Sequence, residues 1–599
     1  MRLAFGALFS AFLAAWGAEA AQPLTFLSQA ARQQSVEFDV FLPLQNVDQL
    51  DELIHAQHTK GSPSYHQWLT PAEFRARFGP DPHAVERISA RLRAAGLTVT
   101  GTHSHGIHVS GSVDEVQSAF GMILWNAKTR DGHARLAARR PLALPRDLVE
   151  AGAHIAAFSP AVQMRSHASH VSPVPLNRYG TTGPYWFTDL KQAYDFPSVQ
   201  ALDGSGTAIG VVIPSDVLDS DIAAYFAQEK MKPPKIVRRP VFGGTAFDAK
   251  DGNSLEAALD VEQSAGMAPG ATIVIYSLPD FSEAAVIAGY LNIVEDNAVD
   301  IVNSSFGNSE ALHIAAYNDG SDFTYLLRLM NEIFKQGNAQ GITFVASSGD
   351  SGALGLPPLA YLTTTPQDPP VVVGSYRLGV EFPASSPYVT AVGGTNLVTT
   401  SQAGSLESKY VSENAFGDPE EPNDPYGVGN LISGGYWGSG GGESVLFAKP
   451  DYQTLVKTGA KNRAIPDVSL HMGGCPRGAI TPCGNDRSSV VVAWNGGLYL
   501  VVGTSASSPE FAGLLALEEQ NLGGRLGNVN YQIYAQAAEQ EAGTWFSYFQ
   551  QGIPGYNGYY STTESGYNMV LGNGTIHARN FIFAPFAEPA GNPQTAGNP

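Results

Sequence analysis

Uninterrupted apolar runs alternate with amphipathic segments along the last two thirds of the chain. The runs are short and rich in β-branched residues, which is typical of strands buried on both faces of a parallel sheet. They lie at residues 207–213, 272–276, 300–303, 342–346 and 388–392. The segments with helical spacing lie at residues 219–230, 254–268, 281–295, 324–337 and 505–522. This alternation predicts an α/β fold, a doubly wound and mostly parallel sheet covered by helices on both faces.

A different pattern occupies the first quarter of the chain. Residues 36–42 alternate as a strand does, residues 47–57, 81–95 and 113–120 have helical spacing, and residues 98–102 and 106–110 form a predicted hairpin. This order predicts a compact α+β domain. Residues 126–185 contain several prolines and the dibasic pair Arg139 and Arg140, which predicts a linker open to cleavage.

The extreme N-terminus predicts export. Residues 1–20 combine Arg2, an apolar stretch and a small-residue cleavage site at Ala18 and Ala20, as signal peptides do. We expect a signal peptide at 1–20, a prodomain with its linker at 21–165, a cleavage-linker region at 166–186, a main domain at 187–584 and a disordered tail at 585–599. No later stretch is apolar for long enough to span a bilayer, so we expect a secreted protein, extracellular or periplasmic.

Charge and cysteine content narrow the function further. The formal net charge is −20, and nearly all of the acidic excess follows residue 165, which argues against nucleic-acid binding. The two cysteines, Cys475 and Cys483, lie in one Gly- and Pro-containing loop. In an oxidising compartment they are expected to form a disulfide, because a metal site would need further ligands nearby.

Residues 503–509 are the strongest candidate for a catalytic motif. Gly503 and Thr504 precede Ser505 at the start of an apolar helix, where backbone N–H groups can face a developing oxyanion. A nucleophilic serine needs a base, usually histidine. However, 11 of the 14 histidines lie before residue 171, and the other three, His313, His471 and His577, adjoin no recognisable motif.

Two groups of carboxylates offer an alternative base. Glu256 and Asp260 stand four residues apart on a predicted helix, so both project from one face and can share a proton. A solvated acidic stripe is the ordinary explanation for such a pair. Asp350 follows the predicted strand 342–346, at the edge of the sheet where α/β proteins place their active sites. A protonated carboxyl there can donate a hydrogen bond to an oxyanion.

Taken in order, these motifs resemble the sedolisin family of serine-carboxyl peptidases, in particular the kumamolisin-type pro-enzymes. The matching segments are residues 62–71, the helix of Glu256 and Asp260, and residues 348–352, 382–395, 439–442, 466–469 and 503–509. The resemblance implies a subtilisin-like main domain after a ferredoxin-like prodomain that serves as intramolecular inhibitor and chaperone. It implies polypeptide substrates, autoprocessing and an acidic pH optimum. Ser505 is implied as nucleophile, Glu256 as its base, Asp260 as the residue that orients Glu256, and Asp350 as oxyanion donor.

The resemblance fails at one expected site. The family usually binds one Ca²⁺ near its C-terminus through two aspartates and backbone carbonyls. Here Gln551, which precedes Gly552, and Asn568, two residues after Gly566, occupy the aspartate positions. Since Ca²⁺ prefers charged oxygen ligands, we expect no tightly bound calcium and no other cofactor.

Two alternatives remain open at this point. His105 and Asp350 lie in stretches that look like the histidine and aspartate motifs of ordinary subtilisins, although the order His105, Asp350, Ser505 differs from the order Asp, His, Ser of that family. The chain could otherwise be a catalytically inactive relative that binds peptides. The histidine-rich first quarter also suggests a trigger that charges near pH ~6.5.

Overall fold

The computed structural model describes residues 24–129, 132–160, 164–173, 182–318, 320–353, 363–364, 372–373, 378–400, 407–418, 421–423, 432–435, 438–475 and 488–584. The predicted signal peptide at 1–20, the tail at 585–599 and Cys483 lie outside these residues. The described part divides into an N-terminal domain (residues 24–160), a connecting segment (residues 164–173) and a C-terminal domain (residues 182–584).

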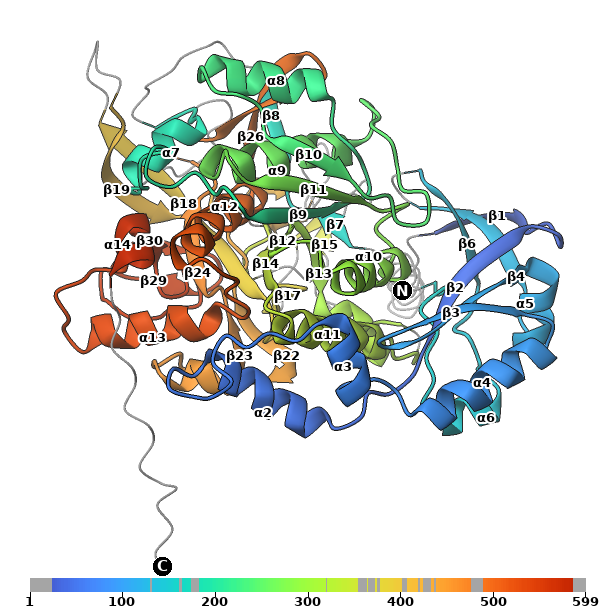
Figure 1. Ribbon diagram of the computed structural model, residues 1–599. Coiled ribbons are helices and arrows are strands. Elements are labelled where there is room, and N and C mark those ends of the chain that lie inside the picture. The colour runs from blue at the N-terminus through green and yellow to red at the C-terminus, as the bar shows by residue number, and fades with distance from the viewer. Residues whose placement is uncertain are drawn as a thin grey trace, which may run out of the picture.

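A ten-stranded sheet runs through the C-terminal domain (Figure 1). Its order is β10 (Lys235–Arg238), β11 (Thr272–Ser277), β9 (Ala208–Ile213), β12 (Ile301–Ser304), β14 (Thr343–Ser347), β18 (Thr390–Thr400), β24 (Val468–His471), β30 (Thr575–Ile576) and β27 (Phe549–Gln550). Neighbours are parallel from β10 to β30, whereas β27 pairs with β30 antiparallel, as does β19 (Lys409–Ala415) with β18. The predicted fold class is confirmed.

Helices cover both faces of this sheet. On one face, α9 (Gly252–Met267) packs against α12 (Thr504–Leu522), and on the other α10 (Glu283–Asp296) packs against α11 (Thr324–Ala339). The remaining helices are α7 (Phe187–Ala193), α8 (Asp219–Gln228), α13 (Asn530–Glu541) and α14 (Ala578–Phe583). Helix α9 is buried from Asn253 to Met267, because the sheet and α12 enclose it. Any carboxylate on α9 is therefore removed from water.

All five predicted strands and all five predicted helices of this domain are present, with ends that differ by a few residues. The strand predicted at 388–392 is longer, because β18 continues to Thr400, where it pairs with β19 beyond the parallel part of the sheet. The short strands β10, β24, β27 and β30 were not predicted, since they give no clear apolar run.

Smaller elements surround the sheet. They are β13 (Phe306–Ser309), β15 (Thr363–Thr364), β16 (Val372–Val373), β17 (Glu381–Phe382), β20 (Glu421–Asn423), β21 (Ile432–Gly435), β22 (Gly442–Ala448), β23 (Asn462–Ile465), β25 (Val490–Trp494), β26 (Gly497–Val502), β28 (Gly555–Tyr556) and β29 (Tyr560–Ser561). Of these, the hairpin of β25 and β26 leads directly into α12. No helix within the described ranges has the length and apolar character needed to cross a membrane.

The N-terminal domain combines two three-stranded antiparallel sheets with helices. One sheet has the order β2 (Ser35–Phe41), β4 (Gly106–Ser112), β3 (Thr98–His103), and the other β1 (Thr25–Gln29), β5 (Leu124–Lys128), β6 (Ala134–Ala138). Its helices are α2 (Val47–His58), α3 (Pro71–Phe78), α4 (Pro82–Ala94), α5 (Val113–Phe120) and α6 (Arg146–Glu150). The hairpin of β5 and β6 occupies part of the segment that the sequence predicted as linker. That expectation is wrong for residues 126–128 and 134–138, because these residues form strands and a third strand, β1, pairs with the hairpin.

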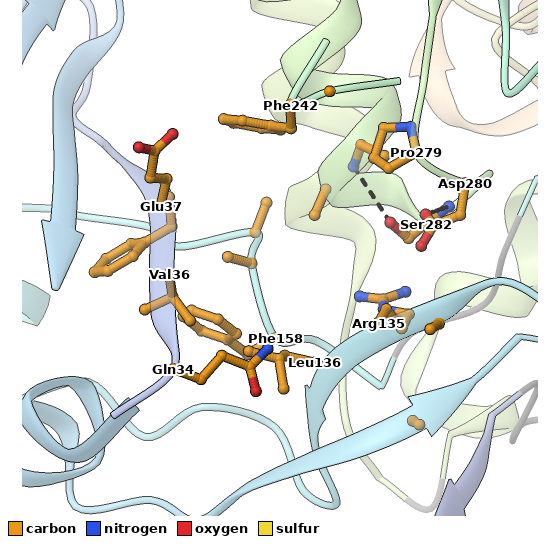
Figure 2. Close-up of a pocket in the computed structure, with 18 of the residues that line it drawn as sticks. Gln34, Val36, Glu37, Arg135, Leu136, Phe158, Phe242, Pro279, Asp280 and Ser282 are labelled. Atoms are coloured by element: carbon orange, nitrogen blue, oxygen red, sulfur yellow. Dashed lines mark hydrogen bonds between the residues drawn. The ribbon is translucent and has the colours of Figure 1, made fainter. Parts of the chain in front are cut away.

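The two domains meet over a broad surface on which α2 lies against α11 (Figure 1). A cavity of about 760 Å³ lies elsewhere between the domains, with Val36 and Phe158 of the N-terminal domain on one side and Phe242 and Ser282 of the C-terminal domain on the other (Figure 2). None of the four predicted catalytic residues lines it. The active site must therefore be sought elsewhere.

The connecting segment is held as two short strands. Strand β7 (Arg165–Ser166) pairs antiparallel with β13, and β8 (Ser169–Pro173) pairs antiparallel with β26. Because β26 leads into α12, this segment passes close to Ser505.

Candidate active site

Ser505 stands in the first turn of α12, two residues after Gly503, where a side chain would clash with its neighbours. Gly503 has φ +137°, and a Cβ on it would lie 2.1 Å from the His167 carbonyl oxygen and 2.5 Å from Asp350 Oδ2. The absence of that Cβ lets the connecting segment and Asp350 approach the start of the helix together. Ser505 is buried, and its hydroxyl donates to the Ser305 carbonyl oxygen at 3.3 Å.

Glu256 and Asp260 project from α9 into the same region. Both are fully buried. Glu256 Oε2 accepts a hydrogen bond from the Ala168 N–H at 2.9 Å and another from the Ser166 hydroxyl. Asp260 Oδ1 accepts from the Ser305 hydroxyl at 2.5 Å and from Asn303 Nδ2 at 3.0 Å. The pair is thus not a solvated acidic stripe.

Burial makes both carboxyls weak acids. It raises the pKa of Glu256 to about 7, against hydrogen bonds from Ser166, Ser505 and Ala168 that favour the charged form. Burial and the neighbouring Glu256 raise the pKa of Asp260 well above its ordinary value. Within the described part of the chain, Glu256 Oε1 and Asp260 Oδ2 have no hydrogen-bond partner. A proton between the two carboxyls satisfies this arrangement.

Asp350 lies on the other side of the Ser505 turn. Its Oδ1 accepts from the Thr504 N–H at 2.7 Å and from the Thr504 hydroxyl at 2.8 Å. Burial raises the pKa of Asp350 to about 6, although His167 and the two Thr504 donors favour the charged form. Asp350 is therefore neutral in mildly acidic solution and able to donate a hydrogen bond from its second oxygen. The structure brings together all four residues that the sequence singled out.

Neither of the histidines near these elements touches the Ser505 hydroxyl. His105 is buried, and its Nε2 bonds Gln336 Oε1 of α11 at 2.8 Å. His167 lies in the connecting segment, with Nδ1 2.7 Å from Ser347 Oγ and Nε2 2.6 Å from Glu381 Oε2. Among the described residues, no histidine nitrogen is hydrogen-bonded to Ser505. This geometry disfavours a histidine-dependent triad.

The connecting segment fills the site in the manner of a bound peptide. The His167 N–H donates to the Ser305 carbonyl oxygen at 3.2 Å, and β7 continues this antiparallel pairing along β13. The His167 carbonyl oxygen and Asp350 Oδ2 both lie beside Gly503. The peptide bond from His167 to Ala168 therefore lies between the serine hydroxyl, the Glu256 carboxylate and Asp350.

A charged pocket holds the His167 side chain. Burial opposes protonation of His167, but Glu381 outweighs burial and raises the imidazole pKa above its ordinary value. Burial likewise opposes ionisation of Glu381, but His167 and Arg165 lower its pKa to about 2. Arg165 reaches Glu381 Oε1 at 3.2 Å. An imidazolium against a carboxylate is thus the stable state of this pocket.

Sequence reasoning missed the residues of the connecting segment and Glu381. Ser166, His167 and Ala168 lie in a stretch with no periodicity, and their contacts with Glu256 and Glu381 span at least 88 positions. The only available signal was the position of Glu381 directly before the matched segment 382–395.

Comparison with known proteins agrees with this architecture. The family described as "Pro-kumamolisin, activation domain" matches residues 22–162, and the family described as "Subtilase family" matches residues 243–533. Kumamolisin from Bacillus sp. (strain MN-32) is 30% identical over 520 residues, which cover 84% of this chain and 83% of that protein. The chain belongs to the sedolisin family of serine-carboxyl peptidases.

Other sedolisins are similar over comparable lengths. Sedolisin from Pseudomonas sp. (strain 101) is 26% identical over 566 residues, covering 92% of this chain and 87% of that protein. The crystal structure of Pseudomonas sedolisin complexed with two molecules of pseudo-iodotyrostatin superposes with a TM-score of 0.52 at 25% identity, over 67% of this chain and 97% of that chain. The chain described here is accordingly a peptidase, made as a zymogen with an activation domain.

The positions that hold calcium in sedolisins are engaged differently here. Gln551 Oε1 accepts from the Gly566 N–H at 3.2 Å, and Gln551 Nε2 donates to the Asn573 carbonyl at 3.0 Å. Asn568 Oδ1 accepts from the N–H groups of Val570 and Leu571, both at 3.0 Å. Gly552 has φ +70°, and a Cβ on it would meet the Thr563 carbonyl oxygen at 2.8 Å. These neutral side-chain oxygens already face N–H donors, so they fit a Ca²⁺ ion poorly.

The predicted disulfide remains a prediction. Cys475 is buried, and its N–H donates to Asp418 Oδ1 at 2.7 Å. Its expected partner Cys483 lies outside the described residues.

Proposed function

We propose that this sedolisin is a secreted, acid-acting endopeptidase, with Ser505 as nucleophile and Glu256 as general base. In this proposal Asp260 orients Glu256 through a shared proton, and Asp350 is the oxyanion donor. One observation carries the proposal. The bond from His167 to Ala168 has its carbonyl oxygen beside Asp350 and Gly503, and its N–H on Glu256.

Acylation follows from these positions. Ser505 Oγ attacks the carbonyl carbon of residue 167 while Glu256 takes the hydroxyl proton. The oxygen that becomes negative gains a hydrogen bond from protonated Asp350. Glu256 then gives its proton to the nitrogen of residue 168, the C–N bond breaks, and a new amino terminus leaves. The 2.9 Å contact between Glu256 Oε2 and that nitrogen already joins the two atoms between which this proton moves.

Deacylation repeats the sequence with water. Glu256 removes a proton from a water molecule that attacks the ester carbonyl, and Asp350 again stabilises the oxyanion. Collapse returns the proton to Ser505 and releases a carboxyl terminus.

The pH dependence follows from the two central carboxyls. Glu256 must be ionised to accept a proton, and Asp350 must be protonated to donate. Because burial places their pKa values at about 7 and about 6, only a minor fraction of molecules satisfies both conditions. That fraction falls in alkaline solution as Asp350 loses its proton and in stronger acid as Glu256 gains one, which supports an enzyme that acts in mildly acidic solution.

The same geometry supports self-processing. The N-terminal domain acts as an intramolecular inhibitor and chaperone, because its connecting segment occupies the cleft that a substrate needs. The first cleavage separates His167 from Ala168. In substrates, the pocket of Ser347 and Glu381 would take a cationic side chain before the cleaved bond.

A pH–rate profile of the full-length precursor tests the proposal. Glu256→Gln keeps the size of the side chain but cannot accept a proton, so self-cleavage should fall at least about 10³-fold, as with Ser505→Ala. Glu37→Gln, an exposed change in β2, should cleave normally. Retained cleavage in Glu256→Gln would refute the base assignment. Normal cleavage in Ser505→Ala would refute the function itself.

A further inference from the structure

The Ser166 hydroxyl contacts the residue that acts as base in the proposed mechanism. This hydroxyl belongs to the bound segment, not to the peptidase domain, and it donates to Glu256 Oε2 beside the Ala168 N–H. The pairing of Ser166 with Phe306 and of Arg165 with Gly307 sets this register. Any peptide bound in the same register presents its corresponding side chain to Glu256.

We propose that a hydroxyl one residue upstream of the residue at the cleaved bond is a recognition element of this peptidase, and that Ser166 acts as a positioning residue for Glu256. The inference rests on the proposed function of Glu256 and Ser505. It names a substrate class, peptides with serine or threonine at that position, for which the precursor's own segment is the example.

The other contacts of Glu256 show what the Ser166 hydroxyl contributes. Glu256 Oε1 lies on the side without a hydrogen-bond partner in the described ranges, where the shared proton with Asp260 fits, so Oε2 is the oxygen available to the reaction. Oε2 receives the leaving N–H of residue 168 from one direction and the Ser166 hydroxyl from another. The hydroxyl thereby holds Oε2 towards the nitrogen that must receive the proton.

The hydroxyl also favours the reactive charge state of the base. Three groups of the connecting segment oppose the effect of burial on Glu256, namely the Ser166 hydroxyl, the Ala168 N–H and the charge of His167. On α9, Asp260 acts in the other direction, as a neighbouring acid. Next to His167 lie Arg165, Glu381 and Asp350. Without the hydroxyl, a smaller fraction of Glu256 is ionised at any acidic pH.

The test uses full-length precursors shifted to pH values from 4 to 9, with first-order loss of precursor measured at several dilutions. Ser166→Ala should slow self-cleavage about tenfold below pH 6. The pH above which the rate declines should also rise, because the pKa of Glu256 moves further above that of Asp350. Ser166→Thr, which keeps the hydroxyl, should cleave as the parent does. Ser28→Ala, which removes an exposed hydroxyl of β1, is the control for a general effect.

Three outcomes would overturn the inference. They are an unchanged rate in Ser166→Ala, an unchanged pH profile despite a slower rate, and an equal loss in Ser166→Thr, which would indicate packing alone. Failure of the proposed function is recognised separately, because Ser505→Ala would then still cleave.

A second arm applies the inference to added substrate. Two peptides with the sequence of residues 164–171 and either Ser or Ala at the position of Ser166 are offered to the mature enzyme. A kcat/KM ratio of about 10 in favour of serine, carried by kcat, supports the inference. A ratio of 1 refutes it.

Discussion

The surface where the N-terminal domain docks and the catalytic centre both bury ionisable side chains, and burial affects the two sets in opposite directions. At the docking surface, burial lowers the pKa of His58 and of His105 to about 4. In the catalytic centre, burial raises the pKa of Glu256 to about 7 and that of Asp350 to about 6. Each set is most stable uncharged, so the docking side chains resist gaining protons and the catalytic ones resist losing them.

The difference links activation to acid in two steps. When the pH falls through about 6, Asp350 takes up the proton that it needs as a donor. Over the range from 6.5 to about 4, an undocked histidine binds a proton that docked His58 or His105 refuses. The docked state is therefore favoured above pH 6.5 and loses stability as the pH falls towards 4. A fall to about pH 6 thus prepares Asp350 as a donor, whereas a further fall towards pH 4 loosens the inhibitor while it protonates more of the base Glu256.

The histidines of the N-terminal domain do not act as the single group that the sequence suggested. His58 Nε2 accepts from the Asn528 N–H at 2.7 Å, a contact that a protonated ring cannot make. His55 and His108, in contrast, have raised pKa values, since each is hydrogen-bonded to a carboxylate, Asp451 and Asp39 respectively. Neither His58 nor the pair His55 and His108 therefore gains its charge near pH 6.5.

The largest expected effect comes from removing titration at the catalytic centre. Asp350→Asn keeps an oxygen for the two Thr504 donors and a permanent donor for the oxyanion. We expect self-cleavage to fall about 10- to 100-fold at pH 5, because an amide is a weaker donor than a carboxylic acid. The bell-shaped pH profile should become a curve that rises to about pH 7 and then stays level.

Precursor loss followed from pH 4 to 9 measures this profile. A decline above pH 7 in Asp350→Asn equal to that of the parent would show that a different group sets the alkaline limit. The catalytic half of the comparison would then be wrong.

An effect of comparable size should follow from removing titration at the docking surface. His58→Gln retains an oxygen that can accept from the Asn528 N–H but cannot be charged. Refusing one proton between pH 6.5 and 4 costs the docked state about 3 kcal/mol, which is about a 100-fold change in opening. In a Ser505→Ala background, the His58→Gln substitution should abolish most of this 100-fold increase in opening between pH 6.5 and pH 4.

Opening can be measured as cleavage by an added acid-stable protease, normalised to an unstructured peptide at each pH. His83→Gln is the matched control, because His83 lies exposed on α4 and away from the docking surface. If opening increased equally on acidification in the Ser505→Ala parent, in His58→Gln and in His83→Gln, the role of His58 would be contradicted.

The smallest effect is expected from calcium, and it tests whether pH alone controls the molecule. Because Gln551 and Asn568 bind backbone N–H groups, a chelator should leave the Tm of the Ser505→Ala precursor unchanged at pH 7. Gln551→Ala removes two hydrogen bonds and should cost about 1–3 kcal/mol. A fall in Tm with chelator that added Ca²⁺ reverses would contradict this prediction.

The sequence predicted the sheet and its covering helices well, and it singled out four candidate residues that the fold places in one region, because these signals are local. A buried parallel strand needs a continuous apolar run, and α9 must carry Glu256 and Asp260 four residues apart to turn both to one face. The same reasoning failed for residues 126–128 and 134–138, which it assigned to a linker. Their strands are specified by pairing with β1, which lies about 100 positions earlier.

By itself, the sequence determined which chemical groups are available: a serine at a helix start, a carboxylate pair on one helix face and an aspartate after a strand. Only the tertiary structure decided what state those groups are in. Enclosure of α9 between the sheet and α12 removes water from Glu256 and raises its pKa, and docking of α2 does the reverse to His58. The bond that meets Ser505 was also decided by the fold, because its register depends on strands β13 and β26, more than 100 residues away. Desolvation and strand register are sums over many distant neighbours, and no local pattern encodes them.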